Sequence, residues 1–471
     1  MLPATEGLTA DAARFVLGSM PSDPALRRAA AAPIIDSVAV MLAGRTSEAG
    51  QAIGAYARLG DPRPSGSAWA AALGGSASPE LAALLNATQG HALDYDDALP
   101  GSGHLSVPIL AASLSAAAIA GRPVDGAELI SVFAVGFEVA AKTGVALGLS
   151  HYKRGYHTTV TGGTFGTTAA AARVLGLTER ELVTAFGIAG SMVAGLMLNF
   201  GTSTKPLHSG LAARNGVTAA MLARSGATAS GGVLESAGGV LDLYGFGEAR
   251  PEAMGSLGAP WALLEPGTGL KLYPCCYAAA RPLDAILGLR SKHGFTGDDI
   301  ETIRCAVPKN GLRPMIHHRP ETGLKAKFSM EYTLAAAALD GRLDLASFED
   351  EAVWRPAVRR LMEKVQLVEE RMLRPEDPDA LRSSPATGGR VEVTVALRDG
   401  RVLEAAVEHP EGSPAKPLSD ERLRGKFLAC AANGGFPAVA ARDVLRRLMT
   451  LEQVPDVLEL VRDLRPSEVQ L

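Results

Sequence analysis

The chain has 471 residues, of which 47% are hydrophobic and 20% are charged. This composition excludes a disordered or fibrous protein, and the length predicts two or three folding units. The formal net charge of −4 lacks the basic excess of nucleic-acid-binding proteins, so we expect no nucleic-acid partner. Because only 5% of the residues are aromatic, we expect a core of close-packed helices filled by small aliphatic side chains.

Targeting signals and membrane segments are not evident in the sequence. The first fifteen residues contain Asp11 and no basic region, so we expect no signal peptide. The longest apolar run, residues 107–120, is shorter than the roughly 20 residues that a membrane-spanning helix needs. None of the four cysteines lies in the spacing of a zinc site, which favours reduced thiols. We therefore expect a cytoplasmic protein with no membrane partner.

Residues 1–267 are predicted to form successive helices. The expected helix starts share an N-cap side chain or a proline in the first turn, and lie at Asp23, Ser78, Asp125, Thr178 and Pro206. The helix that begins at Asp23 is expected to extend toward Gly44, and the one that begins at Ser78 is expected to include Leu81–Leu85. The helices that follow Asp125 and Thr178 are expected over residues 129–149 and 182–198. The helix near Pro206 is expected to reach Arg224. Several of these segments are apolar on all sides, which is typical of helices buried among other helices.

The pattern changes near residue 268. Strand candidates are residues 302–307, 364–368, 390–397 and 402–407, and Asp399-Gly400 is a strong hairpin signal between the last two. Helices are expected over residues 328–339 and 354–364, and again over residues 418–465. We therefore predict a mainly α chain with a large all-helical domain, residues 1–267 plus 411–471. A smaller α+β domain is predicted over residues 268–410.

An acidic cluster with two histidines is the first candidate site. The segment H-A-L-D-Y-D-D covers residues 91–97, and His104 follows closely. If this segment is helical, His91 and Asp94 share one face, as do Asp94 and Asp97. The cluster can be catalytic or substrate-orienting, can bind a divalent metal ion, or can be a solvated helix end. Acidic residues are unfavourable at a helix C-terminus, which weakens the last alternative.

Two predicted helix starts carry basic residues. The first follows Tyr152 and includes His157, with threonines and glycines that leave backbone N–H groups available to an anion. The second is G-T-S-T-K-P-L-H, residues 201–208, in which Lys205 and His208 lie about one helical turn apart. A loop histidine and ordinary helix capping are the alternatives. Together the two starts favour a substrate with more than one carboxylate.

A weaker candidate lies at the predicted domain junction. Lys271 and Cys276 fall in G-L-K-L-Y-P-C-C, residues 269–276, and ligand sites favour such junctions. The sequence has no phosphate-binding loop, no dinucleotide fingerprint after a strand and no G-x-S-x-G nucleophile elbow. These absences disfavour ATP, nicotinamide and serine-hydrolase chemistry.

Five motifs in order resemble the MmgE/PrpD family. They are H-A-L-D-Y-D-D at 91–97, G-Y-H-T-T at 155–159, S-T-K-P-L-H-S-G-L-A-A-R at 203–214, K-L-Y-P-C-C at 271–276 and A-K-F-S-M-E-Y at 326–332. The resemblance implies a large helical domain with a smaller α+β lid domain, a homodimer, and no metal or organic cofactor. It places Asp94, His104, His157, Lys205 and Lys271 in the active site.

The resemblance also implies the chemistry. Family activities include 2-methylcitrate dehydration, cis-aconitate decarboxylation and iminodisuccinate epimerisation, which all move a proton at a carbon next to a carboxylate. We predict a lyase acting on a small di- or tricarboxylate, a dehydratase or a decarboxylase. The predicted catalytic residues are Asp94, His104, His157 and Lys205, and the predicted substrate-binding residues are His91, Tyr152, Lys271, His208 and Cys276.

Departures from the family pattern keep two alternatives open. Ala98 replaces a threonine, Leu105 replaces a proline, and the histidine often found after the lysine-tyrosine-proline motif is missing near Cys276 and Ala280. The missing histidine favours an epimerase or racemase of an amino-dicarboxylate as the second hypothesis. A non-catalytic binding protein that kept the fold is the third.

Overall fold

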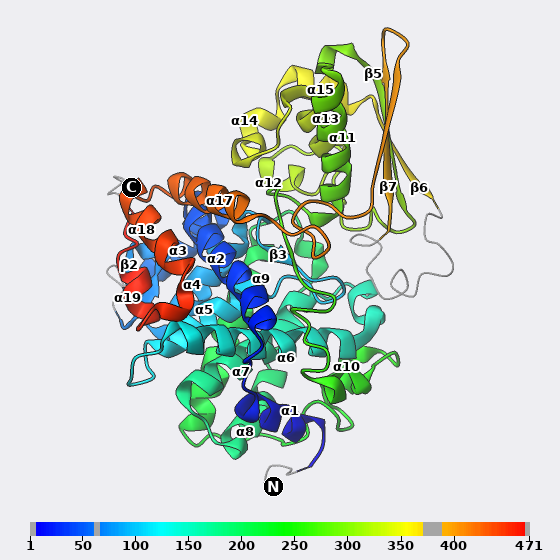
Figure 1. The fold of residues 1–471 in the computed structure, drawn as a ribbon. Helices are drawn as coiled ribbons and strands as arrows, with labels where there is room; N and C mark the ends of the chain where they lie inside the picture. Colours follow the sequence, from blue (N-terminus) through cyan, green and yellow to red (C-terminus); the bar gives the residue numbers. More distant parts are fainter. Residues whose placement is uncertain (1–5, 61–65, 371–388, 467–471) are drawn as a thin grey trace. The chain divides into compact units, whose positions relative to one another are not determined.

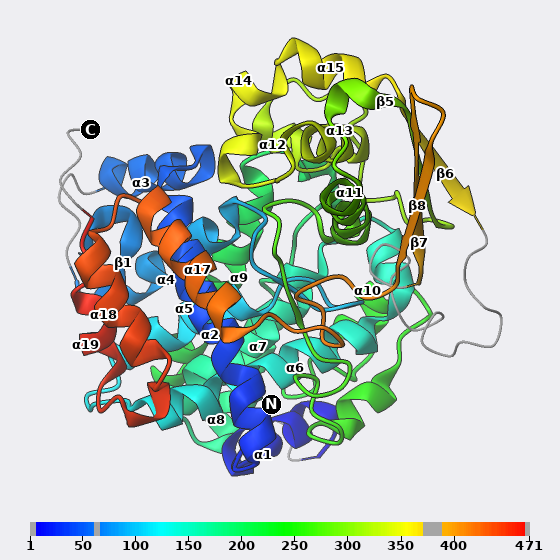
Figure 2. The same cartoon turned by 45° about the horizontal axis from the view of Figure 1, so that its top comes forward.

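The computed structural model describes residues 6–60, 66–370 and 389–466 (Figures 1 and 2). The first five residues of the N-terminal segment discussed above therefore lie outside the described residues. The chain forms two compact units. Unit 1 comprises Met1–Leu198, Ser203–Thr268 and Ser419–Leu471, and unit 2 comprises Asn199–Thr202 and Gly269–Leu418.

Unit 1 is built mainly from helices. Their bounds are α1 Leu8–Gly18, α2 Pro24–Ala43, α3 Glu48–Gly60, α4 Pro79–Ala92, α5 Ser106–Ala117, α6 Gly126–Lys153, α7 Thr158–Leu175, α8 Glu179–Gly190, α9 Thr204–Arg224, α10 Val240–Gly245, α17 Asp420–Asn433, α18 Ala438–Leu448 and α19 Val457–Arg462. The last three come from the C-terminal part of the chain, and α17 packs directly against α2 (Figure 1).

The predicted helix starts are confirmed because they depend on local capping. The side chains of Asp23, Ser78 and Asp125 each accept a hydrogen bond from a backbone N–H in the first turn. Thr178 and Glu181 form the predicted capping box of α8. The predicted end of α8 is wrong, because the helix stops at Gly190 and the chain then turns.

Unit 1 is not all-helical, contrary to the prediction. Strands β1 Ala68–Ala70 and β2 Gly75–Ala77 form an antiparallel pair, and β3 covers Asp97–Ala98. Gly74 enters β2 in the left-handed region, with a φ of 59°. Strands of two or three residues are too short to show the alternation by which a strand is predicted. The broader prediction of a mainly α chain with a small mixed sheet is confirmed.

Two glycines let α9 pack closely between α4 and α7. A Cβ on Gly210 would lie 2.1 Å from Thr88 Oγ1 and 2.6 Å from the carbonyl oxygen of Leu84, both on α4. A Cβ on Gly216 would lie 2.2 Å from Thr167 Oγ1 on α7. Only glycine permits α9 to lie this close to α4 and α7.

Helix α6 is long and apolar enough to cross a membrane by length and composition alone. However, 83% of its most apolar window is buried inside the protein, as expected for the central helix of a folded core. The run at residues 107–120 lies within and just after the shorter buried helix α5.

Unit 2 combines helices with a four-stranded sheet. Its elements are β4 Gly269–Leu270, α11 Ala280–His293, β5 Ile300–Pro308, α12 Gly323–Ala326, α13 Met330–Asp340, α14 Asp350–Val353, α15 Pro356–Met362, β6 Val365–Glu370, β7 Val391–Leu397 and β8 Val402–Val407. The strand order is β6-β5-β7-β8. The β5–β6 pair is parallel with Ile303 opposite Val365, and the other pairs are antiparallel.

The sheet of unit 2 has one covered face. Alternate residues of β7 are buried, as expected for a strand with one face on a core. Helices α11 and α13 pack against the strands on one side, as both views show (Figures 1 and 2). The four strand predictions are each within two residues of the observed bounds, since alternation and the Asp399-Gly400 turn are local signals.

Candidate active site

The acidic cluster lies in a turn after α4 rather than on a helix. Helix α4 ends at Ala92, one residue beyond His91. Asp94 then adopts the left-handed region with a φ of 51°, which few residues other than glycine do without strain. The expectation that His91, Asp94 and Asp97 share helix faces is therefore wrong. The turn instead directs the carboxylates of Asp94 and Asp96 to different partners.

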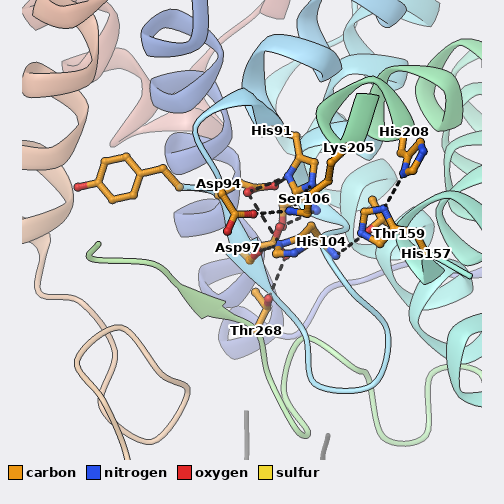
Figure 3. Close-up of polar contacts among 12 residues, drawn as sticks. His91, Asp94, Asp97, His104, Ser106, His157, Thr159, Lys205, His208 and Thr268 are labelled. Carbon is orange, nitrogen blue, oxygen red and sulfur yellow. Dashed lines mark hydrogen bonds and ion pairs between the residues drawn. The ribbon is translucent and has the colours of Figure 1, made fainter. Parts of the chain in front are cut away.

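A buried chain of polar contacts links α9 to this turn (Figure 3). The Lys205 ammonium forms an ion pair with Asp94 and lies 3.1 Å from His91 Nε2. On the other side of its ring, His91 Nδ1 lies 2.9 Å from Asp96 Oδ2. Since a carboxylate and a lysine ammonium flank the ring, Nδ1 carries the hydrogen and Nε2 accepts from Lys205. All four side chains are at most 5% exposed.

His104 enters the cluster from the loop before α5. Its Nδ1 donates a hydrogen bond of 2.6 Å to the backbone carbonyl of Asp97, which leaves the lone pair on Nε2. Its backbone N–H donates to Thr159 Oγ1 at 3.0 Å, so the loop is tied to the first turn of α7. The His104 and His91 rings lie 4.6 Å apart between centroids. With 15% of its side chain exposed, His104 is more accessible than its buried neighbours.

His157 and His208 form a second pair at the starts of α7 and α9. Their Nδ1 atoms are 3.1 Å apart, so one donates and the other accepts (Figure 3). The His157 ring centroid lies 6.0 Å from that of His91 and 6.2 Å from that of His104. The prediction that Lys205 and His208 face one region fits this geometry, because α9 presents both to the histidine cluster.

Burial and positive charge keep these histidines neutral. Desolvation by burial lowers the pKa of His157 well below its usual value, and the charges of Lys205 and His208 lower it further. The pKa of His208 falls to about 4, because of burial first and then because of the charges of His91 and Lys205. Burial also lowers the pKa of His91, although the nearby carboxylate of Asp96 opposes that shift. The site therefore combines a buried ammonium with neutral imidazoles, which suits proton transfer beside an anion.

Asp97 behaves differently from the other acids. Burial and the neighbouring charge of Asp96 raise its pKa to about 7. Its carboxylate accepts hydrogen bonds from the Ser106 backbone N–H at 3.1 Å and from Thr268 Oγ1 at 3.0 Å. Asp97 thus ties together the turn, the start of α5 and the end of the Ser203–Thr268 segment of unit 1.

A divalent ion is the alternative use of this cluster. Among the described residues, two overlapping groups have ligand atoms within 4.8 Å of one another: His91, His104 and His157, and His91, Asp94, Asp96 and His104. Both groups contain His91, whose Nε2 faces the Lys205 ammonium. A metal ion bound there must displace a buried cation that already neutralises Asp94, so the donor set fits a metal poorly.

The remaining predicted residues belong to other elements of the chain. Tyr152 is half-buried at the C-terminal end of α6, and its carbonyl accepts a hydrogen bond from the Gly155 N–H. Its neighbour His151 is buried between Tyr244 and Thr161. Lys271 and Cys276 belong to unit 2, where Lys271 is buried and Cys276 half-buried.

Several polar residues of the cluster were not among the predicted site residues. Asp96 was visible as part of the acidic run but was not distinguished from its neighbours. Thr159 falls inside a motif that assigns it no role, and Ser106 falls outside the motifs. Thr268 carries no local signal, because its contact with Asp97 spans 171 residues of sequence.

Comparison with known proteins agrees with the motifs. The MmgE/PrpD N-terminal domain model matches residues 10–252, and the C-terminal domain model matches residues 273–449. Cis-aconitate decarboxylase of Mus musculus is 29% identical over 93% of this chain and 88% of its own length. The Homo sapiens protein of that name is 28% identical over 92% and 86%, and the Aspergillus terreus protein is 28% identical over 84% of each chain. Since the two family models together cover nearly the whole chain, this protein belongs to the MmgE/PrpD family.

Proposed function

We propose that the protein is a cofactor-independent lyase that releases CO₂ from a small tricarboxylate, with cis-aconitate as the first substrate to test. The observation that carries the proposal is the buried Lys205 ammonium beside the neutral rings of His91 and His157. The names of the relatives quoted above support a decarboxylase over a dehydratase.

The chemistry requires charge stabilisation and one proton. When the bond between carbon and a carboxylate breaks, CO₂ leaves and the electron pair stays on the substrate as an enolate-like anion. Lys205 and the N-termini of α7 and α9 supply the positive potential that stabilises such an anion. A histidine that takes up a proton when the anionic substrate binds then delivers it to carbon and returns to its neutral form, a step that contributes about 10²- to 10⁴-fold.

His104 and His157 are the candidates for that proton transfer. His104 Nε2 is directed away from its anchor on the Asp97 carbonyl, and its side chain is partly exposed. His157 is buried and linked to His208, which can exchange a hydrogen with it through the Nδ1–Nδ1 contact. Asp94 holds the Lys205 ammonium in place.

Proton NMR of the purified protein in D₂O tests this proposal. The panel contains cis-aconitate, 2-methylcitrate and amino-dicarboxylates, with the His157→Ala variant as the control. Loss of CO₂ from cis-aconitate supports the decarboxylase, and loss of water from 2-methylcitrate replaces it with a dehydratase. Deuterium at an α-carbon without a change in connectivity establishes the epimerase instead. Equal product formation by His157→Ala refutes the assigned role of His157.

Two further observations separate the remaining alternatives. Activity that survives exhaustive chelation excludes the divalent-metal alternative, whereas loss on chelation and recovery with added Mn²⁺ or Mg²⁺ establishes it. Binding of carboxylates without turnover of any of them, in wild type and His157→Ala alike, supports a binding protein.

A further inference from the structure

Tyr95 connects the acidic turn to a part of unit 1 outside the histidine cluster. It is the residue between Asp94 and Asp96, and its backbone carbonyl accepts a hydrogen bond of 2.7 Å from Lys426 Nζ. The same ammonium lies 4.0 Å from the centroid of the Tyr95 ring, within cation–π distance. Lys426 thus holds both the backbone and the side chain of one residue in the turn.

Lys426 is itself fixed by a buried carboxylate. It projects from α17, and its Nζ lies 2.7 Å from Asp36 Oδ1 on α2. The two side chains are 2% and 1% exposed. Burying such a pair costs several kcal/mol per ion in desolvation, so it contributes little to stability compared with apolar side chains of the same size. The contact between Lys426 and Tyr95 indicates that the pair serves to hold the acidic turn rather than to stabilise the fold.

The position of the Tyr95 carbonyl sets the geometry on both sides of it. The Tyr95 carbonyl belongs to the peptide bond between Tyr95 and Asp96. The carboxylate of Asp96 accepts a hydrogen bond from His91 Nδ1. On the preceding side, Asp94 is held in the left-handed region and reaches Lys205. A rotation of this peptide would move the Asp96 carboxylate away from His91, and would thus remove the acceptor on Nδ1, one of the two groups that select the His91 tautomer.

We propose that Lys426, anchored by Asp36, is a positioning residue of the active site, and that it acts through Tyr95 to hold Asp96 against His91. This inference rests on the proposed function for its effect on turnover. Its effect on the His91 ring does not depend on that function. Lys426 touches no reacting group in this proposal, since its contacts are with the turn and with α2.

The test removes the pair without leaving a buried charge. The double variant Asp36→Leu/Lys426→Met replaces both ions by apolar side chains, an exchange that is often neutral or stabilising for the fold. Single Lys426→Met strands the Asp36 carboxylate and is not used. The matched control is Glu138→Gln/Lys142→Met, which removes another lysine–carboxylate pair of unit 1, with Nζ and Oε1 3.8 Å apart.

The first readout is the tautomer of His91 from long-range ¹H–¹⁵N correlation spectra without any substrate. Wild type and the control variant are expected to show a single tautomer with hydrogen on Nδ1. The double variant is expected to show a mixture of tautomers, while buried His151 keeps its wild-type signal. An unchanged His91 signal in a folded double variant overturns the proposal, as does an equal change at His91 and His151.

The second readout is the kinetics of whichever reaction the panel establishes. The double variant is expected to lose about 10²-fold in kcat, as for displacement of a reacting group by about 1 Å, with KM changed less than about 3-fold. A wild-type kcat overturns the role in turnover. If no reaction is found in wild type, the proposed function fails while the His91 readout still decides the positioning role.

Discussion

Lys205 Nζ lies 3.1 Å from His91 Nε2, although the two residues are 114 positions apart in sequence. The ammonium also pairs with Asp94, so one buried cation touches both a neutral ring and a carboxylate. This contact links the electrostatics of the site to the tautomers of its histidines. Removal of the Lys205 charge should therefore change the titration of rings that it does not touch.

Replacement of Lys205 and Asp94 together should raise the pKa of His208. The positive charge of Lys205 is one of the causes that hold this pKa near 4, after burial and His91. In Asp94→Asn/Lys205→Met that charge is gone and no buried ion is stranded, so protonation of His208 becomes easier.

NMR titration of the histidine rings measures this shift. His151 is the internal control, because burial lowers its pKa to about 4 and only its hydrogen bond to the Tyr244 carbonyl opposes that shift. A His208 pKa that stays at its wild-type value would contradict the electrostatic assignment. The variant should also lose catalytic activity, because the proposed stabilising cation is absent.

The His104→Asn variant should separate anchoring from proton transfer. An asparagine amide can reproduce the Nδ1–H donation to the Asp97 carbonyl, but it has no counterpart of Nε2. If Nε2 transfers the proton, kcat falls by about 10²- to 10⁴-fold while the free energy of unfolding changes by less than about 1 kcal/mol. Steady-state kinetics and urea denaturation measure the two quantities. Nearly full activity in His104→Asn would assign the transfer to His157.

The sequence predicts those parts of the fold that depend on local signals. Helix starts at Asp23, Ser78 and Asp125 are set by capping side chains within three residues, and the hairpin at Asp399-Gly400 is equally local. The end of α8 at Gly190 was not predicted, because no capping residue in the sequence marks the turn that follows it.

The candidate site was predicted by residue type better than by geometry. The one-turn spacing of Lys205 and His208 indicated a shared face, and the structure brings both to the histidine cluster. The turn at Asp94 was not predictable, because its left-handed conformation is stabilised by a lysine that is distant in sequence. Lys426 was missed for the same reason, since its contact with Tyr95 spans 331 residues.

The carboxyl of Asp97 should make the fold less stable at high pH. Burial raises its pKa from 3.8 to about 7, so the folded protein binds a proton that the unfolded chain releases. The contribution of the Asp97 carboxyl to the free energy of unfolding is therefore fully present below pH 3.8 and is lost as the pH rises through about 7. Between pH 5 and pH 8, the titration of Asp97 alone should lower the free energy of unfolding by roughly 2–3 kcal/mol.

The Asp97→Asn variant measures this cost. The amide keeps an acceptor for the Ser106 N–H and does not titrate. Urea denaturation of both proteins at pH 5 and pH 8 should show a smaller loss of unfolding free energy in the variant. Equal losses in the two proteins would show that Asp97 titrates normally.

The close approach of α9 to α4 predicts different outcomes for two glycine substitutions. In Gly210→Ala, the new Cβ would lie 2.6 Å from the Leu84 carbonyl, which is backbone and cannot rotate away. Helix α9 must then shift, carrying Lys205 from His91 and His208 from His157. We expect a loss of about 1–3 kcal/mol in unfolding free energy from overpacking, and a fall in kcat of about 10²-fold from the displacement.

The matched control is Gly163→Ala on α7, where the nearest heavy atom to the new Cβ is Ala212 Cβ at 3.6 Å, an ordinary van der Waals distance. This substitution should be neutral or stabilise the helix by up to about 1 kcal/mol, because alanine has the higher helix propensity. Urea denaturation and steady-state kinetics on both variants compare the two sites. If Gly210→Ala behaves like Gly163→Ala in stability and turnover, the packing of α9 against α4 does not position Lys205.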